Sequence, residues 1–233
     1  MSGFLEALRR RASLGFVPVI PDFTRVSPAE GPLFPGRDPV EAAAEMAAAG
    51  APLLSGGPAG THFGGSLGLL REIVRASGLP VLRKDFIQSP GDIAETAEAG
   101  AAAVLLICAS MPEDALRACY AAALDLGLEP LVEAHTAEEL ALAGDLGCAL
   151  VGINNRDILK LEKDGGTVDR TAALAALKPP GSFLISESGL QGAADVRRAL
   201  RGGADGVLIG TALWRAPDPF AFYDALNRAE ENP

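Results

Sequence analysis

The chain has 233 residues, 48% of them hydrophobic, which is enough to bury the core of one large domain or two small ones. Its formal net charge is −10, and an acidic surface disfavours nucleic acids and anionic membranes as partners, since both are bound through basic patches. No apolar run reaches the length of a membrane-spanning helix, and Arg9, Arg10 and Arg11 are not followed by the apolar stretch of a secretion signal. We therefore expect a cytoplasmic protein.

One pattern recurs along the chain: an Ala-rich helical segment ends in Gly, and a short apolar run follows. It occurs at Gly50, Gly100, Gly147 and Gly202–Gly203. A Gly just beyond a helix takes the left-handed conformation that ends the helix. The apolar runs do not alternate with polar residues, which is typical of parallel strands buried on both faces.

Eight runs are expected to be strands: Val17–Phe23, Ala51–Leu54, Pro80–Lys84, Ala101–Ile107, Pro130–Glu133, Cys148–Ile153, Phe183–Ser186 and Gly206–Ile209. A helical stretch follows each of them, and Phe220–Glu230 supplies the last. Eight evenly spaced units of this kind predict an α/β fold, a single (β/α)₈ TIM barrel over residues 1–233, with residues 1–16 as a short N-terminal helical extension. An open doubly wound sheet has the same local pattern, but no Gly-x-Gly-x-x-Gly follows the first strand.

The three cysteines, Cys108, Cys119 and Cys148, are expected to be small core residues rather than metal ligands or a disulfide. Their number is odd, and no Cys-x-x-Cys is present. The two histidines, His62 and His135, lie far apart in the sequence and form no metal-binding motif. No metal site is predicted.

Polar residues at the carboxyl ends of barrel strands are candidates for the active site. The candidate catalytic residues are Asp22, Lys84, Glu133, Asn154 and Glu187. A Lys in the barrel mouth can be a general acid, a Schiff-base nucleophile or a phosphate ligand; the alternative is a surface Lys neutralised by Asp85. Glu133 can belong to an acid/base set with Lys84 and Glu187, or it can form a structural ion pair with Lys84 or Arg83. Asn154 can bind substrate or cap a turn.

Candidate phosphate ligands follow the last two strands, at Ser188–Gly189 and Gly210–Thr211. Barrels often bind phosphate there through loop N–H groups and a short extra helix, for which Thr211–Trp214 is suitably placed. Arg156, after the sixth strand, is a further candidate for substrate binding. Two segments are expected to be loops on the same face, Pro28–Gly36 and Leu159–Gly166.

Several strand ends together carry a family resemblance. The matching segments are His62–Leu67, Pro80–Ile87, Glu129–Glu133, Val151–Asp157, Ile185–Leu190 and Val207–Leu213. Taken together, they resemble indole-3-glycerol-phosphate synthase of tryptophan biosynthesis, over about Val17 to Leu213. The sequences Lys-Asp-Phe-Ile and Gly-Ile-Asn-Asn-Arg are rather specific to that family, whereas the Ser-Gly and Gly-Thr segments are shared by many barrels.

The resemblance implies a lyase that closes and decarboxylates 1-(2-carboxyphenylamino)-1-deoxyribulose 5-phosphate without a cofactor. Lys84 is then the general acid at the substrate carbonyl, and Glu133 transfers protons in the dehydration. Asn154 and Glu187 hold substrate hydroxyls, and the phosphate ligands are Ser27, Gly189, Gly210 and Thr211. The implied partner is a small phosphorylated substrate. A monomer or weak oligomer is expected, with other tryptophan-pathway enzymes as candidate partners.

Two features depart from the family pattern. The family's first strand ends in Glu-x-Lys, where this chain has Asp22-Phe-Thr24 followed by Arg25, so a neutral hydroxyl replaces a cation. The family also carries a longer N-terminal extension over the active face, which is expected to be reduced here to Phe4–Arg11. These departures keep two alternatives open: a relative with a shifted substrate, or a non-catalytic barrel that binds a sugar phosphate or a partner enzyme.

Overall fold

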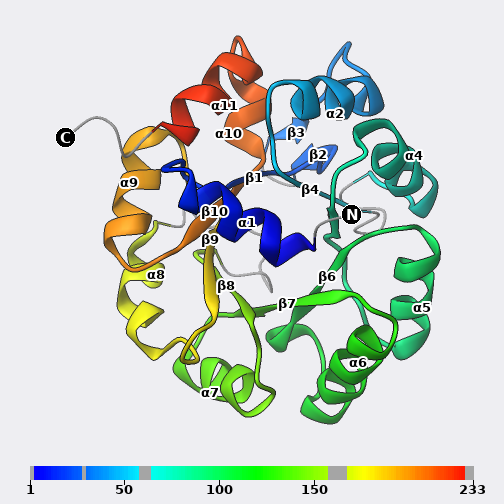
Figure 1. Ribbon diagram of the computed structural model, residues 1–233, viewed down its shortest axis with the longest axis vertical. Helices are drawn as coiled ribbons and strands as arrows, with labels where there is room; N and C mark the ends of the chain where they lie inside the picture. Colours follow the sequence, from blue (N-terminus) through cyan, green and yellow to red (C-terminus); the bar gives the residue numbers. More distant parts are fainter. Residues whose placement is uncertain (1–2, 28–29, 58–63, 157–166, 229–233) are drawn as a thin grey trace.

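The computed structural model describes residues 3–27, 30–57, 64–156 and 167–228. Eight parallel strands form the central sheet: β1 (Val19–Pro21), β4 (Leu54–Gly56), β5 (Val81–Arg83), β6 (Ala103–Ile107), β7 (Glu129–Ala134), β8 (Leu150–Asn154), β9 (Phe183–Glu187) and β10 (Gly206–Ile209). Their order is β1-β10-β9-β8-β7-β6-β5-β4. A parallel bridge between Asp22 and Ser55 joins the two ends of this order, and Phe23 N donates to Ser55 O at 2.7 Å. The predicted barrel is confirmed (Figure 1).

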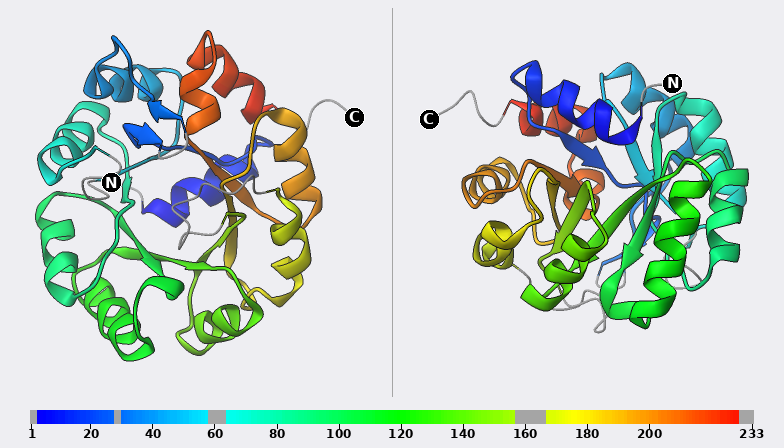
Figure 2. Two further views of the ribbon diagram at one scale, coloured as in Figure 1. Left: turned by 180° about the vertical axis from the view of Figure 1, so that it is seen from behind. Right: turned by 60° about the horizontal axis from the view of Figure 1, so that its bottom comes forward.

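Helices surround the strands, as both views of Figure 2 show. They are α1 (Phe4–Ser13), α2 (Pro39–Ala48), α4 (Leu67–Ser77), α5 (Pro90–Glu98), α6 (Glu113–Asp125), α7 (Ala137–Asp145), α8 (Asp169–Leu174), α9 (Ala193–Arg201), α10 (Thr211–Arg215) and α11 (Pro219–Asn227), with 3₁₀ turns η1 (Cys108–Ser110) and η3 (Ala175–Leu177). Side-chain caps begin many of them; for example, Asp38 accepts hydrogen bonds from Val40 N and Glu41 N. The expected helix-ending glycines, such as Gly50 and Gly147, have positive φ.

The core has an inner layer and an outer layer. Inside the barrel, side chains such as Leu82, Leu131 and Leu208 pack together with almost no exposure. Between strands and helices, other strand residues such as Val104 and Val151 meet the apolar faces of the helices. Both faces of each strand are therefore buried, which explains the unbroken apolar runs in the sequence. The three cysteines lie in this core, as expected, and all are free and buried.

Five strands, β1, β4, β5, β6 and β8, begin one to three residues later than expected. In β1 and β4, proline interrupts the hydrogen-bond ladder. Pro18 and Pro52 have no N–H to donate, and the regular strands begin at Val19 and Leu54. The expected loop Pro28–Gly36 is partly ordered as a short antiparallel pair, β2 (Val26–Ser27) and β3 (Gly31–Pro32). Its residues 28 and 29, and the whole expected loop Leu159–Gly166, lie outside the described residues.

The expected role of the N-terminal helix was wrong. Helix α1 forms, but it packs across the amino ends of the strands, opposite the polar strand ends (Figure 2). Phe4 and Leu8 are fully buried against the inner barrel layer. The backbone N–H groups of Phe4 and Leu5 donate to the carboxylate of Glu129, the first residue of β7, at 2.5 and 2.8 Å. This helix closes the far end of the barrel and does not cover the candidate site.

Within the described ranges, no helix is long and apolar enough to cross a membrane.

Candidate functional site

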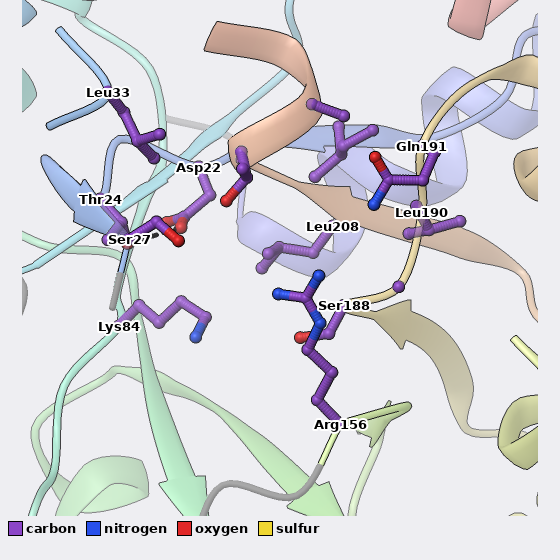
Figure 3. Close-up of a pocket in the computed structure, with 15 residues that line it drawn as sticks. Asp22, Thr24, Ser27, Leu33, Lys84, Arg156, Ser188, Leu190, Gln191 and Leu208 are labelled. Atoms are coloured by element: carbon purple, nitrogen blue, oxygen red, sulfur yellow. Dashed lines mark hydrogen bonds between the residues drawn. The ribbon is translucent and has the colours of Figure 1, made fainter. Parts of the chain in front are cut away.

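A pocket opens at the carboxyl ends of the strands and brings together residues from both halves of the chain (Figure 3). Most of the sequence-predicted site residues line it: Asp22, Ser27, Lys84, Arg156, Ser188, Gly189, Gly210 and Thr211. Thr24, Leu33 and Gln191 also face it. The other three candidates, Glu133, Asn154 and Glu187, are buried in the barrel at the same strand ends.

Strand β5 sends two neighbouring cations in opposite directions. Arg83 is 4% exposed and turns outward to α5, where its guanidinium donates to Asp92 O and Thr96 Oγ1. It also pairs with Asp85 at 2.8 Å. Lys84 lines the pocket instead, and its side chain points into it (Figure 3). Asp85 therefore neutralises Arg83, and Arg83 is not the structural partner that was considered for Glu133.

Two hydroxyl groups hold the carboxylate of Asp22. Thr24 Oγ1 donates to Asp22 Oδ2 at 2.6 Å, and Ser55 Oγ donates to Asp22 Oδ1 at 2.8 Å. Asp22 is 5% exposed, so these bonds offset part of the cost of burying its charge. Arg25 does not turn into the pocket: its guanidinium bonds the carbonyl oxygen of Gly64.

The ends of β9 and β10 form the wall where phosphate binding was predicted. Ser188 has φ 63°, the only positive value among the described residues other than glycine, and Gly189 follows with φ 71°. Such a conformation costs of order 1–3 kcal/mol in a non-glycine residue and concentrates at functional sites. It turns the chain back toward the pocket beside the start of α10. Ser27 of β2, 6% exposed, lies on the opposite side of the pocket (Figure 3).

Arg156 brings a second cation to the pocket. Its guanidinium lies near Ser188 and faces the same space as Lys84 (Figure 3). Its Nε atom is buried and has no hydrogen-bond partner in the described part of the chain. A buried donor of this kind is costly unless something accepts from it. Two cations beside the turns at Ser188–Gly189 and Gly210–Thr211 make the pocket suited to an anion.

Glu133 is on β7 and Glu187 is on β9, with β8 and its Asn154 between them. In the strand register, Glu133 pairs with Gly152, and Asn154 pairs with Glu187. All three candidate side chains are fully buried. Asn154 serves the local turn as well, because its Oδ1 accepts from Arg156 N at 2.9 Å. Two carboxylates in this setting can exchange protons with a ligand in the barrel mouth.

Asn155 is a residue whose importance the sequence did not reveal. It is 3% exposed, and its Nδ2 lies within hydrogen-bond distance of Ser186 Oγ, Glu187 O and Ser188 O, at 2.9–3.1 Å. Its Oδ1 accepts from the N–H and hydroxyl of Thr171 in α8. Asn155 therefore fixes the turn that carries Glu187 and Ser188. The sequence signals were its position at the end of the sixth expected strand and its place in the Gly-Ile-Asn-Asn-Arg segment, and neither gave it a role.

The described residues contain no cluster of three His, Cys, Asp or Glu side chains arranged to hold a metal ion.

The chain is similar to members of one known protein family. The profile of the family "Indole-3-glycerol phosphate synthase" matches residues 1–226. An indole-3-glycerol phosphate synthase of Thermococcus kodakarensis is 45% identical over 212 residues, covering 91% of this chain and 92% of that protein. Those of Pyrococcus furiosus (45%, covering 87% and 88%) and Halalkalibacterium halodurans (39%, covering 92% and 82%) are also similar.

A solved structure shows the same fold at low sequence identity. Orotidine 5′-phosphate decarboxylase from Pyrococcus horikoshii OT3 superposes with a TM-score of 0.67 and 13% identity, covering 92% of this chain and all of that one. At this identity the likeness concerns the barrel architecture alone.

Proposed function

The chain belongs to the indole-3-glycerol phosphate synthase family, and we propose from its geometry how its own residues carry out the synthase reaction. Its activity is that of a decarboxylating lyase of tryptophan biosynthesis. The reaction closes the ring of 1-(2-carboxyphenylamino)-1-deoxyribulose 5-phosphate and releases carbon dioxide and water. The observation that carries the proposed roles is the pocket in which Lys84 faces the Ser188–Gly189 and Gly210–Thr211 turns.

Lys84 is the proposed general acid. During ring closure the substrate carbonyl oxygen gains negative charge, and a cation close to it lowers the barrier. Lys84 extends into the pocket, whereas its neighbour Arg83 turns outward into the ion pair with Asp85. A role in the site therefore fits Lys84 better than a role in surface charge balance.

The substrate phosphate is proposed to bind at the wall formed by Ser188, Gly189, Gly210 and Thr211, with Ser27 opposite. The left-handed turn at Ser188 and Gly189 supports this, because strain of that kind is kept where it orients groups toward a ligand. Arg156 adds charge, and its buried Nε lacks a protein partner among the residues described. Local N–H groups and cations can hold an anion although the whole chain is acidic.

The buried carboxylates are proposed to handle protons. Glu133 is assigned the dehydration step, while Asn154 at the end of β8 and Glu187 at the end of β9 hold substrate hydroxyl groups. Asp22 contributes a fixed negative charge, held by Thr24 and Ser55. The two residues that differ from the family's first-strand motif, Asp22 and Thr24, are hydrogen-bonded to each other. The two changes therefore fit together.

We also infer a cytoplasmic protein that acts on its small phosphorylated substrate as a monomer or weak oligomer, with other enzymes of the pathway as candidate partners. A cofactor is not required by the proposed roles.

Turnover by the purified protein tests the proposal. The carboxyphenylamino-deoxyribulose phosphate is added, and the rise of indole fluorescence is followed with time. Steady turnover with loss of carbon dioxide supports the synthase. Tight binding of the substrate without turnover would instead favour a binding protein. If the protein neither binds nor turns over this compound, a relative with a shifted substrate is favoured.

A further inference from the structure

One buried imidazole contacts a candidate catalytic carboxylate. His135 follows β7 directly, two residues after Glu133, so the two side chains leave the chain on the same side. His135 Nε2 lies 3.6 Å from Glu133 Oε1, and His135 Nδ1 lies 3.6 Å from Glu139 Oε2. The His135 side chain is 10% exposed and that of Glu133 is fully buried. The imidazole therefore sits between two carboxylates.

The start of α7 holds the second carboxylate in place. Thr136 caps the helix by accepting a hydrogen bond from Glu139 N at 3.2 Å. The Glu139 carboxylate in turn accepts a hydrogen bond from His135 N. Glu139 is thus tied to the backbone of the residue whose ring it faces, and the ring has little freedom to turn away from Glu133.

We propose, on the basis of the function above, that His135 is a positioning residue that presents a positive charge to Glu133 and is itself held by Glu139. A buried carboxylate is costly to ionise unless an opposite charge lies close to it. At 3.6 Å, a protonated imidazole favours the ionised form of Glu133, the form that can accept a proton from the substrate.

The charges around His135 favour its protonation. Burial by itself lowers the pKa of His135, but the carboxylates of Glu139 and Glu133 outweigh burial, and the pKa is raised above its ordinary value of 6.5. Arg170 of α8 acts in the opposite direction. Cys108 of η1 lies near both carboxylates, and burial raises its pKa to about 12, so it stays neutral. For Glu139, burial raises the pKa, but contacts with His135 more than offset this and the net pKa is lowered.

The first test measures His135 itself and needs no turnover. The chain has two histidines, so an NMR titration shows two imidazoles, and His62→Gln assigns them. We expect His135 to titrate above 6.5, and Glu133→Gln and Glu139→Gln each to lower its midpoint by about one pH unit. Glu138→Gln is the matched control: it removes the same charge from the same helical turn, at an exposed position, and should leave the midpoint unchanged.

A midpoint that does not respond to Glu133→Gln would overturn the proposal, as would a wild-type midpoint below 6.5. Because this titration is independent of activity, it decides the proposal even if the wild-type protein fails to turn over the synthase substrate. That failure would count against the proposed function alone.

The second test uses the pH profile of kcat. His135→Gln removes the charge but keeps a polar side chain. Glu133 then ionises less readily, and we expect the acidic limb of the profile to shift to higher pH by about one unit. Glu138→Gln should keep the wild-type profile. If His135→Gln lowers kcat equally at every pH, or leaves it unchanged, His135 has only a structural role and the proposal is wrong.

Discussion

A methyl group placed on Gly152 would lie 2.0 Å from Oε1 of Glu187, so the carboxylate of Glu187 occupies space that only glycine leaves free. Gly152 is on β8 and Glu187 ends β9, one strand further round the barrel. The absence of a side chain at position 152 thus sets the place of a candidate catalytic group on the neighbouring strand.

Gly152→Ala should displace Glu187 and lower kcat by at least about 10-fold, with a stability loss of about 1–3 kcal/mol from overpacking. Turnover and urea unfolding measure the two effects. Gly68→Ala is the matched control, because its added methyl meets only an ordinary contact with Ser66 in a helix. That variant should be as stable as the wild type or slightly more so. Full activity in Gly152→Ala would argue against a catalytic role for Glu187.

Lys84→Ala should lower kcat at least about 100-fold, since this is the smaller effect expected when a general acid is lost. The fluorescence assay measures it, and binding of inorganic phosphate should persist because the phosphate wall is intact. Lys178→Ala serves as the comparison: Lys178 pairs with Asp205, and neither residue lines the pocket. Near-normal turnover in Lys84→Ala would refute the assignment of Lys84 as the general acid.

Asn155→Ala should raise KM for the phosphorylated substrate and reduce stability by about 1–3 kcal/mol, because the buried groups that Asn155 bonds lose their partner. The KM effect is expected through the turn at Ser188. Thr171→Val breaks the same network from the α8 side and should lower stability with a smaller effect on KM. Steady-state kinetics and chemical denaturation of both variants would tell a role in the turn from a purely structural one. Equal KM values in the two variants would contradict the expectation.

Thr24→Val keeps the shape of the side chain and removes the hydroxyl that donates to Asp22 Oδ2. We expect kcat to fall by about 10-fold or more while phosphate affinity is kept, because a hydrogen bond to a charged group is worth about 1.5–3 kcal/mol. Thr24→Lys should be at least as active as Thr24→Val, because an ammonium group can also pair with Asp22. A lysine variant much less active than the valine variant would mean that this part of the pocket excludes a cation.

Stability should depend on pH through His135. A group whose pKa is raised in the folded state stabilises the protein fully below its unfolded value, here 6.5, and this contribution is lost as the pH rises through the folded value. The difference in Tm between the wild type and His135→Gln should therefore be larger at pH 6 than at pH 9. For a chain of this length, each kcal/mol corresponds to about 2–4 °C. A constant difference across this range would rule out the expected charge effect.

The sequence predicted the barrel because each βα unit carries its own local signals. A glycine such as Gly100 ends a helix, and an unbroken apolar run such as 101–107 marks a strand buried on both faces. Once the eight strands are located, the polar residues at their carboxyl ends are known. Most residues lining the pocket could therefore be named from the sequence.

The direction in which a side chain points and the depth at which it is buried could not be predicted from these local signals. Arg83 and Lys84 are adjacent cations at the end of a three-residue strand, and only the contacts with α5 show that Arg83 is the one facing outward. The depth of Glu133 and Glu187 depends on the register of neighbouring strands. The side chain of Asn155 acts through contacts more than 30 residues away in the sequence. Helix α1 was misplaced for the same reason, because its partners are strand beginnings distributed over the whole chain.

Because α1 lies at the end of the barrel opposite the pocket, its contribution to stability is spatially separate from the residues proposed for catalysis. Its buried face, with Phe4 and Leu8, meets the barrel at the end away from Lys84 and the phosphate wall. Heat resistance could therefore be adjusted at that end by repacking α1, while turnover is tuned independently at the other. An engineer would have two sets of positions that hardly interact, since substitutions far apart without shared contacts have nearly additive effects.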